Sequence, residues 1–217
     1  MMNESLTQKA YREIRRLILR LDLAPGSFLN EGELQERLGI GRTPVREAIQ
    51  RLTREQLLAV VPRRGLYVTD IKPDELPMLC ETRATLEPYI TRLAARRGLD
   101  RHWDEMGAII ESAPVVHDDG DLMEIDRRCH ELTWEAADNR YLTDTLDMLY
   151  AQSERLWYFY LADVTDMRSA VDEHAEIFDA LRSGDGDTAA ALAEAHVRSF
   201  DAQVRQVLRK RNISTPA

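Results

Sequence analysis

Apolar residues recur at every third or fourth position along most of the chain, which is the period of an amphipathic helix. In the N-terminal third this pattern predicts helices from Leu6 to Leu21, from Glu31 to Leu38, and from about Pro44 onward. Gly39 and Gly41 lie between the last two helices, where a tight turn requires the positive φ that glycine tolerates. The pattern therefore predicts a helix-turn-helix.

A β-hairpin is expected directly after this motif. Thr43 should cap the third helix, with Pro44 in its first turn, where a missing N–H costs nothing. Two β-prone runs follow at residues 58–61 and 66–68, and the four residues between them, Pro62-Arg63-Arg64-Gly65, have hairpin chemistry. A hairpin with two arginines at its tip, beside a helix-turn-helix, is typical of a DNA-binding winged helix.

From Pro73 onward the chain has almost no strand pattern. Short breaks rich in glycine, proline or aspartate separate segments with helical periodicity, and such lengths suffice to bury a core between antiparallel helices. The predicted helices cover residues 74–97, 101–112, 119–137, 140–162, 167–183 and 186–210.

The predicted fold is mainly α, with an N-terminal winged helix-turn-helix domain over residues 1–71 and a C-terminal all-α antiparallel bundle over residues 72–217. The formal net charge of −9 argues against nucleic acid as a partner only until it is divided between these domains. Residues 1–71 carry 12 Lys and Arg against 9 Asp and Glu, a net of +3, and residues 72–217 carry the remaining net of −12. Only the first domain is suited to meet phosphate.

The sequence indicates neither a membrane protein nor a protein stabilised by disulfides. No apolar run approaches the roughly 18 residues that cross a bilayer, and residues 1–5 lack signal-peptide character, so a cytoplasmic protein is expected. Cys80 and Cys129 are too few for a disulfide framework and are expected as buried free thiols.

The residues expected to contact DNA lie on the third helix and at the hairpin tip. The N-terminal end of a recognition helix is where side chains meet base edges and phosphates in the major groove. One arginine alone is more often a solvated surface charge, but several on one predicted face favour contact with nucleic acid. The predicted DNA-binding set is Arg42, Thr43, Arg46, Gln50, Arg63, Arg64 and Gly65.

The first 70 or so residues resemble the winged helix of the GntR family of bacterial transcription regulators. The resemblance rests on Leu23-Ala24-Pro25-Gly26, on the specific core Arg42-Thr43-Pro44-Val45-Arg46-Glu47-Ala48, and on Arg63-Arg64-Gly65. Two residues depart from the family pattern. Gly41 stands where members often carry serine, and Gln56 stands where glycine usually follows the recognition helix, which predicts a strained entry to the wing.

The predicted bundle places three histidines on apolar helical stripes. Asp126 and His130 are four residues apart and project from one helix face, while His174 and His196 lie on the inward stripes of two later helices. A single such histidine is usually a hydrogen-bonded core residue. One carboxylate and three imidazoles directed into one bundle instead favour a site for a divalent metal.

This arrangement resembles the FCD ligand-binding domain of the FadR-type GntR subfamily, over about residues 73–210. The resemblance implies that Asp126, His130, His174 and His196 bind a metal, with zinc expected first and nickel, manganese or iron as alternatives. The remaining two histidines, His102 and His117, match nothing and are expected at the surface.

The same resemblance extends to the segment Glu81–Pro88 and implies that its arginine, Arg83, points toward the metal. Arg83 would then hold a carboxylate effector, and the alternative is a helix-surface salt bridge from Arg83 to Glu87. Trp157 and Tyr160 are expected in ordinary core packing, with lining of the effector site as the alternative.

Together these features predict a metabolite-responsive, DNA-binding transcription regulator and not an enzyme. It should bind an inverted-repeat operator as a homodimer, and a small carboxylate at the metal site should release it, as for a repressor. The alternative is a DNA-tethered metalloenzyme that acts on a small organic acid, with Glu131 or Glu173 as the base.

Overall fold

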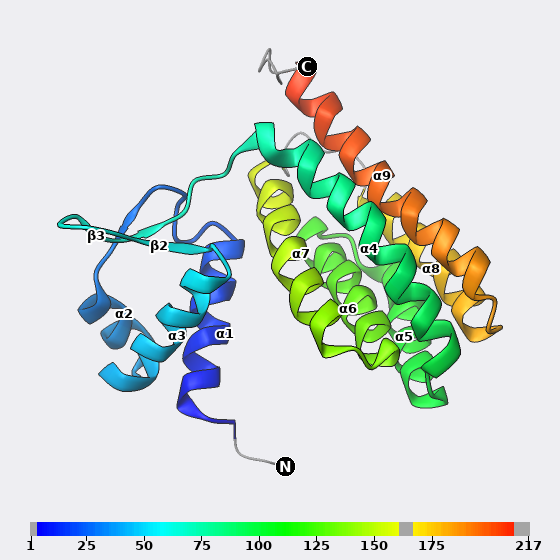
Figure 1. Cartoon of the computed structure of the whole chain (residues 1–217), viewed down its shortest axis with the longest axis horizontal. Helices are drawn as coiled ribbons and strands as arrows, with labels where there is room; N and C mark the ends of the chain where they lie inside the picture. The colour runs from blue at the N-terminus through cyan, green and yellow to red at the C-terminus, as the bar shows by residue number, and fades with distance from the viewer. Residues whose placement is uncertain (1–3, 161–166, 211–217) are drawn as a thin grey trace. The chain divides into compact units, whose positions relative to one another are not determined.

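The computed structural model describes residues 4–160 and 167–210 (Figure 1). Two compact units divide the chain, one comprising the residues up to Lys72 together with Glu154–Phe159, and the other comprising the rest from Pro73. None of the described helices has the length and apolar character that crossing a membrane requires.

The N-terminal unit consists of three helices and a small antiparallel sheet, and its β2–β3 hairpin projects beyond the helices (Figure 1). The strands lie in the order β1-β3-β2, and Val61 pairs with Gly65 at the closed end of the hairpin. The predicted winged helix-turn-helix is confirmed. The elements are α1 (Leu6–Leu19), β1 (Phe28–Leu29), α2 (Glu31–Leu38), α3 (Arg42–Arg54), β2 (Leu58–Val61) and β3 (Gly65–Val68).

Apolar residues on α1 and α3 form the core of this unit. Ile14 and Ile18 of α1 and Ala48 and Leu52 of α3 are buried, with the spacing of four residues that places side chains on one helix face. The two helices pack against each other. This packing leaves the polar face of α3 exposed.

Two predicted helix ends differ from the structure. Helix α3 begins at Arg42 with Gly41 as its N-cap, so the prediction that Thr43 caps it is wrong. Gly39 already takes the left-handed conformation that ends α2, so the chain can re-enter a helix at once. Helix α1 ends at Leu19 and not at Leu21, because Leu21 adopts a φ of +61°. Gln56 has a φ of +60°, as the departure from glycine predicted.

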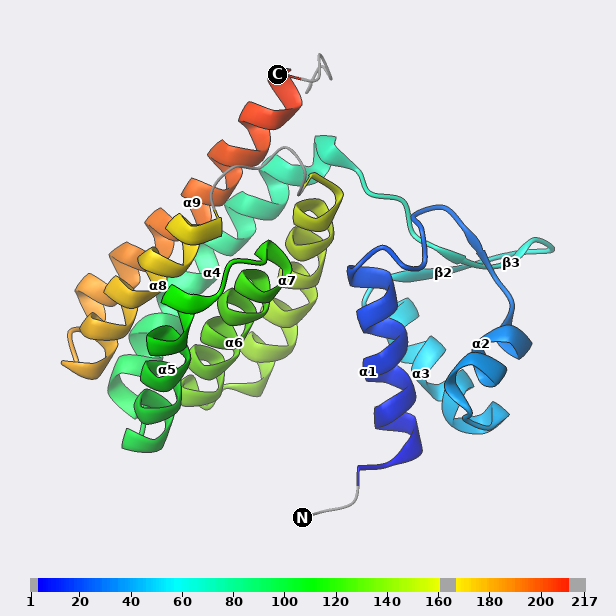
Figure 2. The ribbon, with the colours of Figure 1, turned by 180° about the vertical axis from the view of Figure 1, so that it is seen from behind.

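The C-terminal unit is a bundle of six α-helices within the described residues (Figure 2). Helix α4 packs along α9 and α6, and α8 packs against α9, α6 and α5. The predicted helices are confirmed to within two residues at each end, except that residues 161 and 162 lie outside the described part. The elements are α4 (Leu76–Arg97), α5 (Asp100–Ser112), α6 (Asp119–Ala137), α7 (Arg140–Tyr160), α8 (Met167–Arg182) and α9 (Gly186–Lys210), with short 3-10 turns at Pro73–Glu75 and Ala113–Val115.

The burial expected from the sequence is confirmed for five further residues and is wrong for one. Cys80 and Cys129 are buried free thiols, and Trp157 and Tyr160 are buried, as expected. The surface position expected for His102 is wrong. Its side chain is buried because Nδ1 accepts a hydrogen bond of 3.1 Å from the backbone N–H of Leu99, which has no side-chain acceptor of its own to cap α5. His117 is exposed, as predicted.

Candidate metal centre and nucleic-acid interface

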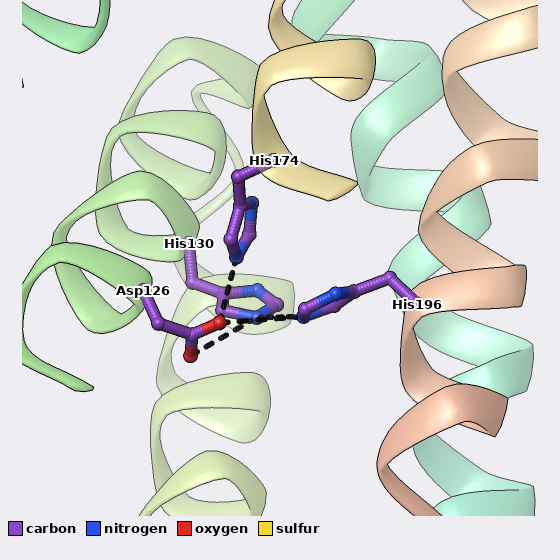
Figure 3. Close-up of side chains that lie close together, drawn as sticks. All are labelled: Asp126, His130, His174 and His196. Atoms are coloured by element: carbon purple, nitrogen blue, oxygen red, sulfur yellow. Dashed lines mark hydrogen bonds and ion pairs between the residues drawn. The ribbon is translucent and has the colours of Figure 1, made fainter. Parts of the chain in front are cut away.

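Three helices of the bundle bring four side chains together (Figure 3). Asp126 and His130 lie one turn apart on α6, while His174 comes from α8 and His196 from α9. All four are buried, and one ligand atom from each lies within 4.8 Å of those of the others. The predicted cluster is thus assembled in the structure.

Three of the distances between donor atoms match those between ligands of one ion. His174 Nε2 lies 2.9 Å and His196 Nε2 lies 3.5 Å from Asp126 Oδ1, and His130 Nε2 lies 3.3 Å from His196 Nε2. Metal–ligand bonds of about 2.1 Å place adjacent donors about 3.0–3.4 Å apart. The carboxylate and the three imidazoles therefore fit a divalent cation.

Carboxylates behind two of the rings determine which nitrogen faces the centre. His196 Nδ1 donates to Glu173 Oε2 at 2.7 Å, and His130 Nδ1 lies 3.6 Å from Glu87 Oε1. Because a carboxylate only accepts, the Glu173 contact places a hydrogen on Nδ1 of His196 and leaves Nε2 directed toward the centre. His130 Nε2 and His196 Nε2 lie 3.3 Å apart, a spacing that two ligands of one cation can take.

The protonation states of this cluster suit metal binding. Burial lowers the pKa of His174 to about 4. The neighbouring His196 also lowers this pKa, whereas the charge of Asp126 raises it. Burial alone would raise the pKa of Asp126, but its interactions with His174 and the other two histidines hold that pKa well below its usual range. At neutral pH His174 is therefore neutral and Asp126 ionised, as metal ligands must be.

Tyr150 lies at the second oxygen of the Asp126 carboxylate. The Tyr150 hydroxyl donates to Asp126 Oδ2 at 2.6 Å and lies 3.6 Å from Met123 Sδ. The charged oxygen is the stronger acceptor. Sequence reasoning missed Tyr150, since nothing in the pattern of α7 distinguishes it from an ordinary core tyrosine.

Arg83 lies inside the bundle and not on its surface. Its side chain is 3% exposed, its Nη2 lies 3.1 Å from Glu87 Oε1, and its Nη1 donates to Ser153 Oγ at 3.0 Å. The expected partner Glu87 is therefore present, but as a buried pair. Glu87 Oε2 also accepts from Trp134 Nε1 at 3.2 Å.

The charge of Glu87 is stabilised despite its burial. Burial alone would raise the pKa of this carboxyl, but His130, Arg83 and Trp134 together lower it to about 2. Glu87 thus links the arginine on one side to a ring of the cluster on the other. From the sequence, Glu87 is expected only as a salt-bridge partner of Arg83, and its contact with His130 is not predicted.

The residues predicted to contact DNA are exposed in the N-terminal unit. Arg46 of α3 also forms an ion pair of 2.9 Å with Glu31 of α2. Gly65 has a φ of +103°, and a Cβ there would lie 2.7 Å from the Phe28 ring, so the hairpin requires glycine. The exposed set comprises Arg42, Thr43, Arg46 and Gln50 on α3, Arg63 and Arg64 at the hairpin tip, and Gly65.

Both units match known protein families. Residues 6–68 match the family described as bacterial regulatory proteins, gntR family, and residues 78–199 match the FCD domain. The repressor RspR of Escherichia coli K12, an HTH-type transcriptional repressor, is 29% identical over 211 residues, covering 94% of this chain and 91% of its own length. The Nta operon transcriptional regulator of Aminobacter aminovorans is 28% identical over 191 residues, covering 85% of this chain and 88% of its own.

Solved structures share the fold. Escherichia coli McbR/YncC superposes with a TM-score of 0.82 at 20% identity, covering 94% of this chain and 99% of its own. A putative GntR regulator from Rhodococcus sp. RHA1 gives a TM-score of 0.73 at 20% identity, with the same coverage of 94% and 99%. The sequence relatives RspR and the Nta operon regulator are transcription regulators and not enzymes, which confirms the predicted class over the metalloenzyme alternative. The chain therefore belongs to the GntR family of bacterial transcription regulators, with an N-terminal helix-turn-helix and a C-terminal FCD domain.

Proposed function

We propose that this protein is a repressor that binds its operator as a homodimer and is released by a small carboxylate bound beside a divalent metal ion. The buried cluster of Asp126, His130, His174 and His196 is the observation that carries the proposal, because a metal held by these four residues would have coordination positions left for a small molecule. The relative RspR is a transcriptional repressor, which supports the proposed direction of regulation.

The cluster would hold the metal through Asp126 Oδ1 and three Nε2 atoms. Imidazole with carboxylate suits zinc first, and also nickel, manganese or iron. When bound, the ion would offer its remaining coordination positions to oxygen atoms of the effector. Glu87 and Glu173 would keep the rings of His130 and His196 oriented.

Arg83 would contact the effector with the donors that its neighbours leave. Its hydrogen bonds from Nε, Nη1 and Nη2 to Glu87 and Ser153 use three of the five guanidinium N–H groups. An effector carboxylate that accepts hydrogen bonds from the remaining two N–H groups would compete with Glu87 for the positive charge of Arg83. Binding would then alter the Arg83–Glu87–His130 contacts, which is a means of coupling the effector to the metal cluster.

The DNA-binding unit would meet the operator through the exposed α3 residues and the hairpin arginines. Arg42, Thr43, Arg46 and Gln50 would enter the major groove, while Arg63 and Arg64 would contact the flanking backbone or minor groove. One winged helix covers one half-site, so two copies related by a two-fold axis would bind an inverted repeat. Such a role places the protein in the cytoplasm.

The test combines metal analysis with DNA binding by the full-length protein. We expect one divalent metal per chain, a gel shift with the DNA upstream of its own gene, and release by one member of a panel of small carboxylates. Treatment with a chelator should remove the response to that acid. His117→Ala, at an exposed histidine, is the matched control for variants of the cluster. Release by the acid that persists after metal removal would contradict the proposal.

A further inference from the structure

We propose that Tyr150 is a positioning residue that confines Asp126 to metal ligation through one oxygen and so leaves room for the effector carboxylate. This inference rests on the metal site proposed above. It concerns a residue on α7, which contributes no ligand atom to the cluster.

The position of the Tyr150 hydroxyl is held by packing on several sides. The side chain is 3% exposed, and its ring centroid lies 4.9 Å from that of His130 and 5.9 Å from that of Trp134, edge-on to the latter. The Arg83 guanidinium carbon lies 5.2 Å from the centroid of the Tyr150 ring. A ring so enclosed cannot turn its hydroxyl away from Asp126 without displacing these neighbours.

The two oxygens of Asp126 have different partners. Oδ1 lies 2.9 Å from His174 Nε2 and 3.5 Å from His196 Nε2, within the group of donor atoms. Oδ2 accepts from Tyr150 at 2.6 Å and lies 3.9 Å from His130 Nε2. Oδ2 is therefore close enough to reach an ion at the centre, and the hydrogen bond to Tyr150 holds it away.

Removal of the hydroxyl would change how Asp126 binds. In Tyr150→Phe the shape of the side chain is kept, but Oδ2 becomes a buried carboxylate oxygen without this donor, which is costly. Rotation toward the metal would satisfy Oδ2 and turn Asp126 into a chelating ligand. The extra oxygen would occupy a coordination position that an effector carboxylate needs.

The experiment uses the full-length protein loaded with Co²⁺, whose visible absorption reports its coordination. The probes are Co²⁺ alone and then acetate, titrated into wild type, Tyr150→Phe and Tyr141→Phe. Tyr141 is the matched control because it lies on the same helix and is 71% exposed. We expect all three proteins to bind one Co²⁺ per chain.

The proposal predicts that only Tyr150→Phe changes the Co²⁺ spectrum before acetate is added. It also predicts that this variant loses about tenfold or more in acetate affinity while its Co²⁺ affinity stays within about tenfold of wild type. A Co²⁺ spectrum identical to that of wild type overturns the proposal. So does loss of Co²⁺ binding, because Tyr150 would then serve only to support the site.

A measurement on the wild type keeps the test independent of how well the variant folds. The infrared carboxylate bands that change on Co²⁺ binding should show a splitting no narrower than that of the metal-free carboxylate, because the hydrogen bond from Tyr150 to Oδ2 moderates the wide splitting of a one-oxygen ligand. A splitting well below that of the metal-free carboxylate, as in a chelating ligand, overturns the proposal without any substitution. If wild type binds no Co²⁺ at this cluster, the proposed function itself fails, which is a separate result.

Discussion

Glu87→Gln should destabilise the bundle far more than the loss of an ordinary helix salt bridge. The side chain of Glu87 is 2% exposed, and its two oxygens accept from Arg83 and from Trp134. Glutamine keeps the shape but supplies one acceptor oxygen. If that oxygen faces Arg83, the amide N–H₂ faces the Trp134 N–H, and the guanidinium loses its counter-charge.

The expected cost follows from that geometry. Breaking a buried ion pair by removing one partner typically costs about 3–5 kcal/mol, because the other charge stays buried without compensation. The matched control is the exposed pair of Glu194 and Arg198, which has the same four-residue spacing and an N–O distance of 2.7 Å. Glu194→Gln should cost less than about 0.5 kcal/mol, since water replaces the lost contact on the surface.

Urea unfolding of the chelator-treated protein, followed by tryptophan fluorescence, measures both variants. Trp103, Trp134 and Trp157 lie on α5, α6 and α7, so the emission reports on these helices. An unchanged slope with urea would show that stability alone has altered. A cost for Glu87→Gln below about 1 kcal/mol, close to that of Glu194→Gln, would refute the reasoning that this buried charge pair is coupled. Addition of Arg83→Met to Glu87→Gln should restore part of the loss, since it removes the unpaired charge.

Three further predictions concern DNA, metal and pH. Arg46→Ala should abolish the gel shift at physiological salt while metal content stays unchanged, and persistent binding would remove this exposed arginine from the DNA contacts. His174→Ala should lower both metal stoichiometry, measured by elemental analysis, and the response to the effector, and full occupancy would contradict its role as a ligand. The metal-free protein should lose stability as the pH falls from about 6.5 toward 4, because the pKa of His174 is lowered from 6.5 to about 4 and the unfolded chain takes up the proton first. Urea unfolding at pH 7 and pH 5 checks this, and equal stability at both would contradict it.

The helices could be predicted because the burial of residues within each one follows the helical period. On α1, Ile14 and Ile18 recur at helical spacing, and any core that buries one also buries the other. The two-residue strand β1 was missed because it is too short to show alternation, and it exists through its pairing with β3. The start of α3 was misplaced because Thr43 and Gly41 are both acceptable caps, and the conformation of Gly39 decides between them.

The four residues of the buried cluster could be predicted for a similar local reason. Asp126 and His130 share a face of α6 by their spacing alone, and His174 and His196 lie on inward stripes. Their partners could not be predicted in this way. Neither the tyrosine at residue 150 nor the glutamate at residue 87 differs in pattern from other core and salt-bridge residues.

By itself, the sequence determined which segments are helices, which half of the chain can meet phosphate, and which four side chains could gather around a metal. These properties depend on periodicity, charge and spacing, which residues close together in the sequence determine. Only the tertiary structure decided that Tyr150 holds one oxygen of Asp126 and that Arg83 and Glu87 form a buried pair behind His130. Such contacts join different helices, and their register depends on how the whole bundle packs.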